Sequence, residues 1–302
     1  MRGRAGDAHA FPPMKPVLLA VLAALALLAL AACSPLRAFN ALVPKDGGTR
    51  LVVRDAAFGT HPRQRLDVYA PRPRDGDGPR PLLVFIHGGS WASGDKAGYG
   101  WVGRAFAAQG FVTAVPNYRL VPDGRYPAML QDGAAAVRWL RVNAAKLGAN
   151  PDRIVLVGHS AGAYNAAMLA LDERWLGAED KAAVRAFVGL AGPYDFLPLI
   201  GPILEPAFGR PADPAATQPV THAGPGDPPA LLLHGAKDTT VRPENAVSLA
   251  RSLQAAGVET KAKIYPDLGH VGVVTALARP WRGGAPVLRD AVEFAKAAVR
   301  AP

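Results

Sequence analysis

The chain has 302 residues, of which 50% are hydrophobic and 19% are charged, so its composition excludes intrinsic disorder and a coiled coil for most of its length. The single cysteine excludes an internal disulfide framework and a multi-cysteine metal site. The formal net charge of +10 comes from basic residues scattered among acidic ones, which predicts solvated surface charge and no nucleic-acid partner.

The N-terminal residues are typical of an export signal. An unbroken apolar run extends from Val17 to Ala32, follows Lys15 and ends at Cys33. The run is shorter than the roughly 20 residues of a membrane span but fits the apolar core of a signal peptide. Leu30-Ala31-Ala32-Cys33 resembles a bacterial lipobox, in which the cysteine is lipidated. We therefore predict a signal peptide over 1–32 and a membrane lipid anchor at Cys33.

Two other readings of this segment stay open. Ala29-Leu30-Ala31 also fits an ordinary cleavage site, which would leave a soluble periplasmic or secreted protein, and the run could instead remain as an uncleaved anchor. Ser34 after the cysteine resembles lipoproteins sorted to an outer membrane, facing the periplasm. Met14 fits a signal-peptide start better than Met1.

After a predicted tether over 33–48, the remaining residues, 49–302, read as one catalytic domain. Short apolar strands alternate with helices, which is typical of a mostly parallel, doubly wound sheet covered on both faces. The predicted strands are 51–53, 65–69, 82–86, 111–115, 154–157, 184–190, 230–233 and 260–265. The predicted helices are 97–109, 127–147, 161–171, 243–256 and 286–299.

One segment, 196–228, interrupts this alternation. It is rich in proline and glycine and has no hydrophobic period. Long irregular loops in compact domains are often functional lids, so the segment is a candidate cap, with a wandering surface connection as the alternative.

The strongest chemical motif is Gly158-His159-Ser160-Ala161-Gly162, which directly follows the predicted strand 154–157 and precedes a predicted helix. G-x-S-x-G between a strand and a helix is the nucleophile elbow, in which small residues allow a sharp turn that projects the serine hydroxyl. We therefore predict that Ser160 is a nucleophile.

A second glycine motif, His87-Gly88-Gly89-Ser90-Trp91, follows the strand 82–86. Consecutive glycines can direct backbone N–H groups toward one point, as a developing oxyanion requires. Gly88 and Gly89, joined by the backbone of Ala161, are the predicted oxyanion hole.

A serine nucleophile needs a base and an orienting acid. Of the seven histidines, His270 remains for the base, because it lies in a loop between the last strand and the last helix. Asp238 follows a strand, and the chain order Ser160, Asp238, His270 matches that of an α/β-hydrolase. Asp195 and Asp267 are the rival acids.

These motifs resemble those of α/β-hydrolase esterases of the hormone-sensitive-lipase-like and feruloyl-esterase-like type, which carry H-G-G-x-W and G-x-S-A-G. The resemblance runs from about Leu66 to the C-terminus and includes Asn117-Tyr118-Arg119-Leu120 and Pro151-Asp152-Arg153-Ile154. It implies an α/β-hydrolase fold with a small cap over 196–228, and the same triad and oxyanion residues. The aromatic residues near these turns are either substrate-pocket or core residues, namely Trp91, Tyr164, Tyr194 and Phe196.

The predicted function is hydrolysis of a small carboxylic ester through an acyl-enzyme. No metal-ligand spacing or phosphate loop appears in the sequence, so neither a metal nor a cofactor is predicted. An amidase of the arylformamidase type shares these motifs and is the alternative enzyme. The non-enzymatic alternative is a surface lipoprotein that uses the fold only for binding.

Overall fold

The computed structural model describes residues 35–73 and 78–300 of the chain. These residues form an eight-stranded sheet in the order β1-β2-β4-β3-β5-β6-β7-β8. The strands from β3 to β8 run parallel to one another, whereas β1 and β2 are antiparallel at one edge. Their bounds are β1 (Thr49–Ala57), β2 (Arg65–Pro71), β3 (Arg80–Ile86), β4 (Val112–Pro116), β5 (Ala149–His159), β6 (Val184–Leu190), β7 (Ala230–Gly235) and β8 (Thr260–Tyr265).

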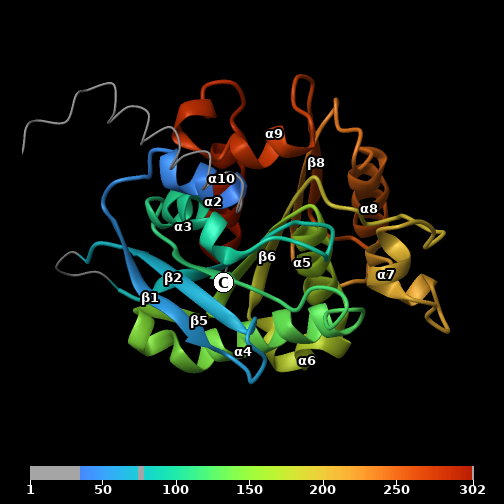
Figure 1. Ribbon diagram of the computed structural model, residues 1–302, viewed down its shortest axis with the longest axis horizontal. Coiled ribbons are helices and arrows are strands. Elements are labelled where there is room, and N and C mark those ends of the chain that lie inside the picture. Colours follow the sequence, from blue (N-terminus) through green and yellow to red (C-terminus); the bar gives the residue numbers. More distant parts are fainter. Residues whose placement is uncertain (1–34, 74–77, 301–302) are drawn as a thin grey trace, which may run out of the picture.

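Helices cover both faces of the sheet (Figure 1). One face carries α3 (Gly100–Ala107), α9 (His270–Thr275) and α10 (Val287–Arg300). The other carries α4 (Ala128–Leu147), α5 (Ala161–Leu171), α6 (Glu173–Ala182) and α8 (Glu244–Ala255). The predicted α/β architecture is therefore confirmed.

The central strands are apolar throughout because their alternate side chains enter two separate cores. In β5, Ile154 and Leu156 pack in the core beneath α4 and α5, whereas Val155 and Val157 pack in the core beneath α3 and α10. Successive side chains of a strand point to opposite faces, so a strand covered on both faces has no polar side.

The regular elements agree closely with the predicted ones. The bounds of α5, β6 and β8 coincide with the predicted ranges, but the helix predicted over 97–109 is divided into a 3₁₀ turn, η1 (Lys96–Gly98), and α3. Helix α6 was not predicted: only Leu176 is buried in it, and Gly177 has a positive φ of 77°. A helix with so little buried surface lacks the apolar period on which the prediction depended.

Within the predicted tether, Pro35–Leu42 is not an extended linker but forms the helix α2. The ring of Phe39 lies 5.5 Å from those of Trp101 and Trp281. The side chain of Asn40 donates to the carbonyl oxygen of Ala97 and accepts from the N–H of Trp101. An isolated helix of eight residues is marginal in water, so these tertiary contacts stabilise it. No helix among residues 35–73 and 78–300 has the length and apolarity that a membrane crossing requires.

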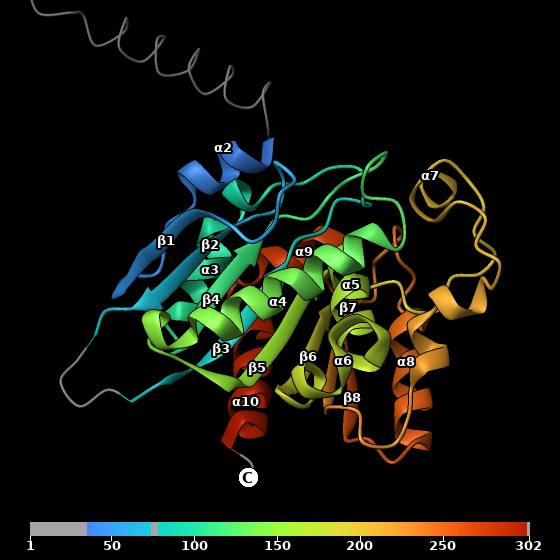
Figure 2. The ribbon, with the colours of Figure 1, turned by 90° about the horizontal axis from the view of Figure 1, so that it is seen from below.

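The candidate cap at 196–228 is an irregular connection between β6 and β7. It contains α7 (Leu204–Phe208) and two 3₁₀ turns, η2 (Ala215–Thr217) and η3 (Pro219–His222). The buried side chain of Gln218 accepts a hydrogen bond from the N–H of Phe196, which connects the start of the segment to the turn before η3. Figure 2 shows α7 and α2 toward the same end of the domain, beyond the carboxyl ends of the parallel strands.

Candidate active site

The turn between β5 and α5 has the strained geometry of a nucleophile elbow. Ser160 has φ 54° and ψ −124°, and its N–H donates to the carbonyl oxygen of Leu190 at 2.9 Å. A Cβ atom on Gly158 would lie 2.2 Å from the carbonyl oxygen of Gly162, and one on Gly162 would lie 2.1 Å from that of Ile86. No side chain fits at either position, which explains the two glycines of the motif.

Ser160, His270 and Asp238 form a continuous chain of hydrogen bonds. The Nε2 atom of His270 lies 2.8 Å from Ser160 Oγ, and its Nδ1 atom lies 2.8 Å from Asp238 Oδ2. The three residues come from the β5–α5 turn, the loop after β7 and the first residue of α9. In this arrangement Nδ1 donates to the carboxylate and Nε2 accepts the serine proton.

Backbone amides hold the carboxylate of Asp238 in place. Its Oδ1 atom accepts from the N–H groups of Thr240 and Val241, each at 2.9 Å. Burial opposes ionisation of this carboxyl, but the hydrogen bonds from Val241 and His270 outweigh it, so the pKa of Asp238 lies below its usual value. Asp238 is therefore available as an anion to stabilise a protonated His270.

Neither rival acid contacts His270. Asp195 Oδ2 accepts a hydrogen bond from Ser248 Oγ, and Asp267 forms an exposed ion pair with Lys237 at 2.8 Å. The structure thus brings together the predicted combination with Asp238.

The predicted oxyanion residues lie at this serine. A Cβ atom on Gly88 would lie 3.1 Å from Ser160 Cβ, and Gly89 has a φ of 125°, a conformation that favours glycine. Ala161 is the first residue of α5, so its N–H has no acceptor within the helix. Ser90 and Trp91 continue the turn with φ values of 52° and 56°.

Sequence reasoning missed the residues that support this turn. The ring of His87 stacks on that of Tyr118 at 4.7 Å, and its Nδ1 donates to the carbonyl oxygen of Gly88 at 2.8 Å. The Tyr118 hydroxyl donates to the carbonyl oxygen of His87. Tyr118 belongs to the Asn117–Leu120 motif that resembles those of the esterases, and this was the signal that could have indicated its role.

A further missed residue, His234, contacts the predicted acid. Its Nε2 atom lies 3.1 Å from Asp238 Oδ2 and 2.8 Å from the carbonyl oxygen of Val241, with the ring fully buried. The sequence showed His234 only as the end of a strand, although it lies four residues before Asp238.

Two of the four aromatic pocket candidates line the cavity at Ser160. This cavity of about 490 Å³ is lined by Trp91 and Phe196 and by apolar residues of the candidate cap. Tyr164 and Tyr194 do not line it, because both are buried in the core. Tyr164 lies behind the lining, with its ring 5.4 Å from that of Trp91. Of the two alternatives that the sequence left open for these tyrosines, their burial favours the core.

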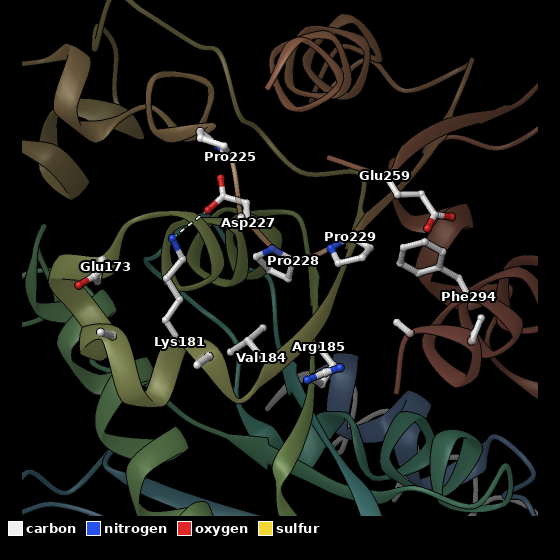
Figure 3. Close-up of a pocket in the computed structure, with 15 residues that line it drawn as sticks. Glu173, Lys181, Val184, Arg185, Pro225, Asp227, Pro228, Pro229, Glu259 and Phe294 are labelled. Carbon is white, nitrogen blue, oxygen red and sulfur yellow. Dashed lines mark hydrogen bonds and ion pairs between the residues drawn. The ribbon is translucent and has the colours of Figure 1, made fainter. Parts of the chain in front are cut away.

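Another cavity, of about 580 Å³, lies at the opposite end of β6 and contains no predicted site residue. Figure 3 shows Lys181 and Asp227 paired across it, with 2.8 Å between Nζ and Oδ1, and Pro228 and Pro229 beside them. Because none of the triad or oxyanion residues lines it, this cavity is not the candidate active site.

The buried histidines around the site predict an acid-sensitive fold. Burial lowers the pKa of His87 to about 4 and that of His159 to about 3, both from 6.5, and it also lowers the pKa of His234. Below pH 6.5 the unfolded chain binds protons on these residues while the folded chain does not. Each histidine should therefore remove about 1.4 kcal/mol of stability per pH unit as the pH falls from 6.5 toward its folded-state pKa.

Urea unfolding measured between pH 7 and pH 5 tests this expectation. In a His159→Gln variant, the free energy of unfolding should depend less steeply on pH, because about one proton fewer binds on unfolding. A free energy of unfolding that stays constant over this range, or an unchanged slope in the variant, would contradict it.

The mostly parallel sheet with a serine on the β5–α5 elbow defines an α/β-hydrolase. A family model described as BD-FAE matches residues 66–253, more than half of the chain, so the chain belongs to this family.

Individual relatives agree with this assignment. The chain is 28% identical over 257 residues to the probable isoprenylcysteine alpha-carbonyl methylesterase ICMEL1 of Arabidopsis thaliana, covering 77% of this chain and 53% of that protein. It is 30% identical over 239 residues to the esterase LipC of Mycobacterium tuberculosis, covering 72% of this chain and 59% of LipC. The chain thus spans little more than half of these relatives.

Among solved structures, Thermogutta terrifontis esterase 2 phosphoramylated by tabun superimposes with a TM-score of 0.66. The two sequences are 26% identical, and the match covers 83% of this chain and 95% of the esterase. The expected α/β-hydrolase fold is confirmed by this likeness.

Proposed function

We propose that the protein hydrolyses carboxylic esters through an acyl-enzyme. Ser160 Oγ attacks the ester carbonyl carbon while His270 Nε2 takes the hydroxyl proton, and Asp238 stabilises the imidazolium that forms. When the C–O bond breaks, His270 returns the proton to the alkoxide leaving group. Water then attacks the acyl-enzyme in the same way and releases the acid. The hydrogen-bond chain from Ser160 to Asp238, with both links at 2.8 Å, carries this proposal.

The oxyanion formed in both steps needs preorganised donors. The backbone N–H groups of Gly88, Gly89 and Ala161 are the proposed donors, because Gly88 and Ala161 adjoin Ser160 and the turn is braced by His87. One such donor contributes roughly 3 kcal/mol to transition-state stabilisation.

The names of the relatives support ester substrates. They include a methylesterase and an esterase, and the solved relative is an esterase. The comparisons provide no support for the arylformamidase-type amidase or for a protein that only binds.

A substrate panel tests the proposed reaction. The purified protein should hydrolyse p-nitrophenyl butyrate and react rapidly with a fluorophosphonate probe, because both reactions require an activated serine. Formyl-kynurenine should be cleaved far more slowly than the ester. Faster cleavage of formyl-kynurenine than of the ester would establish an amidase instead. If neither substrate is cleaved and the probe does not label the protein, the proposed hydrolase function is overturned.

We further propose that the protein is exported and anchored through a lipid on Cys33, with its domain facing the periplasm from an outer membrane. Cys33 lies outside the described residues, so the lipobox sequence carries this proposal. Labelled palmitate should be incorporated into the wild-type chain and not into a Cys33→Ala variant. Equal incorporation by both chains would contradict the anchor.

A further inference from the structure

Large apolar side chains are exposed beside the cavity that holds Ser160. Leu197, Ile200 and Ile203 lie in the connection that leads to α7, and Ile200 is 68% exposed. We call these three residues the mouth face. A group of exposed apolar side chains on a folded domain marks an interaction surface.

The mouth face is continuous with the site. Leu197, Ile200 and Ile203 line the 490 Å³ cavity together with Ser160 and Trp91. An apolar chain lying on this face would therefore lie against the wall of the cavity that contains the nucleophile.

The described chain begins at the same end of the domain. Pro35, the first residue of α2, lines a cavity of about 570 Å³ together with Gly88 and Gly89 of the oxyanion turn. Ser90 and Trp91, the next residues of that turn, line the cavity of the mouth face, so one turn contributes residues to both cavities. Figure 2 shows α2 at the end of the domain to which α7 also points.

The sequence before Pro35 therefore starts beside the site. Cys33 is two residues away, which limits the separation of their Cα atoms to about 7 Å. The apolar run Val17–Ala32 precedes it. Either a lipid on Cys33 or this run would hold the bilayer at the end of the domain where the site opens.

We propose that the mouth face rests on a phospholipid bilayer, and that the ester cleaved by Ser160 belongs to an amphiphile whose apolar chain is held in that bilayer. Here the exposed apolar side chains contact the lipid interface, and the substrate reaches the cavity without passing through water. The substrate part of this proposal rests on the ester hydrolysis proposed above, whereas the membrane contact does not.

Site-specific fluorescence on the full chain tests the contact. Ile200→Cys is labelled with a bimane dye after reconstitution into vesicles of phosphatidylcholine and phosphatidylglycerol. Val142→Cys is the matched control, because Val142 is 84% exposed on α4, away from the site. Doxyl-labelled phosphatidylcholine should quench the dye at position 200 about twofold or more and leave that at position 142 unchanged. Absent or equal quenching at the two positions would overturn the proposal.

Charge substitutions test the route of the substrate. In Ile200→Glu, hydrolysis of p-nitrophenyl palmitate held in the vesicles should fall at least about tenfold relative to that of dissolved p-nitrophenyl butyrate, because a carboxylate resists burial in lipid. Val142→Glu should leave this ratio unchanged. If Ile200→Glu leaves the ratio of palmitate to butyrate hydrolysis unchanged, the membrane route is overturned, whereas cleavage of butyrate still supports the proposed function. If the wild-type chain hydrolyses neither ester, the proposed function itself is overturned.

Discussion

Ser160→Ala should lose ester hydrolysis by roughly five to six orders of magnitude in kcat/KM. The substitution removes the hydroxyl that donates a hydrogen bond to His270 Nε2, so no acyl-enzyme can form. The residual rate should come from the oxyanion turn and substrate binding, which still favour attack by water. The fold should persist, because the backbone of Ser160 keeps its bond to Leu190 and alanine removes a single atom.

Steady-state hydrolysis of p-nitrophenyl butyrate and fluorophosphonate labelling measure this effect. Ser252→Ala, on α8, is the matched control and should retain wild-type activity and labelling. Substantial activity in Ser160→Ala with an unchanged thermal unfolding midpoint would refute the mechanism.

Asp238→Asn should lower kcat/KM by about ten thousandfold. The carboxylate accepts from His270 Nδ1 and so fixes the tautomer in which Nε2 is free to take the serine proton. An asparagine amide can instead donate to Nδ1, which favours the opposite tautomer and places a proton on Nε2. It also removes the negative charge that stabilises the imidazolium.

The two rival acids provide the comparison. Asp195→Asn and Asp267→Asn should each change kcat/KM by less than about tenfold, because Asp195 bonds to Ser248 and Asp267 to Lys237. A loss in Asp195→Asn as large as that in Asp238→Asn would assign the acid to the end of β6 instead.

The central sheet and the nucleophile elbow could be predicted because their physical causes are local. The two glycines at Gly158 and Gly162 are required by backbone contacts under 2.5 Å, so the sequence pattern and the turn correspond directly. The apolar strands could be predicted for a similar reason, because a strand that is buried on both faces is apolar along its whole length.

The features that were missed depend on tertiary contacts. The helix α2 is held by rings of Trp101 and Trp281, which are far from Phe39 in the sequence. The burial of Tyr164 and Tyr194, and the contact of His234 with Asp238, follow from how layers stack rather than from any period. Aromatic identity near a turn does not distinguish a cavity wall from the core behind it.

The placement of His270 has a consequence for biosynthesis. His270 begins α9, immediately beyond β8, and β8 pairs only with β7 at the edge of the sheet. The base and the serine are 110 residues apart, so they meet only after the edge strand has emerged from the ribosome and added to the sheet. A nascent chain that ends before β8 thus carries the serine without its base, and hydrolytic activity requires that the carboxyl-terminal part of the domain has docked.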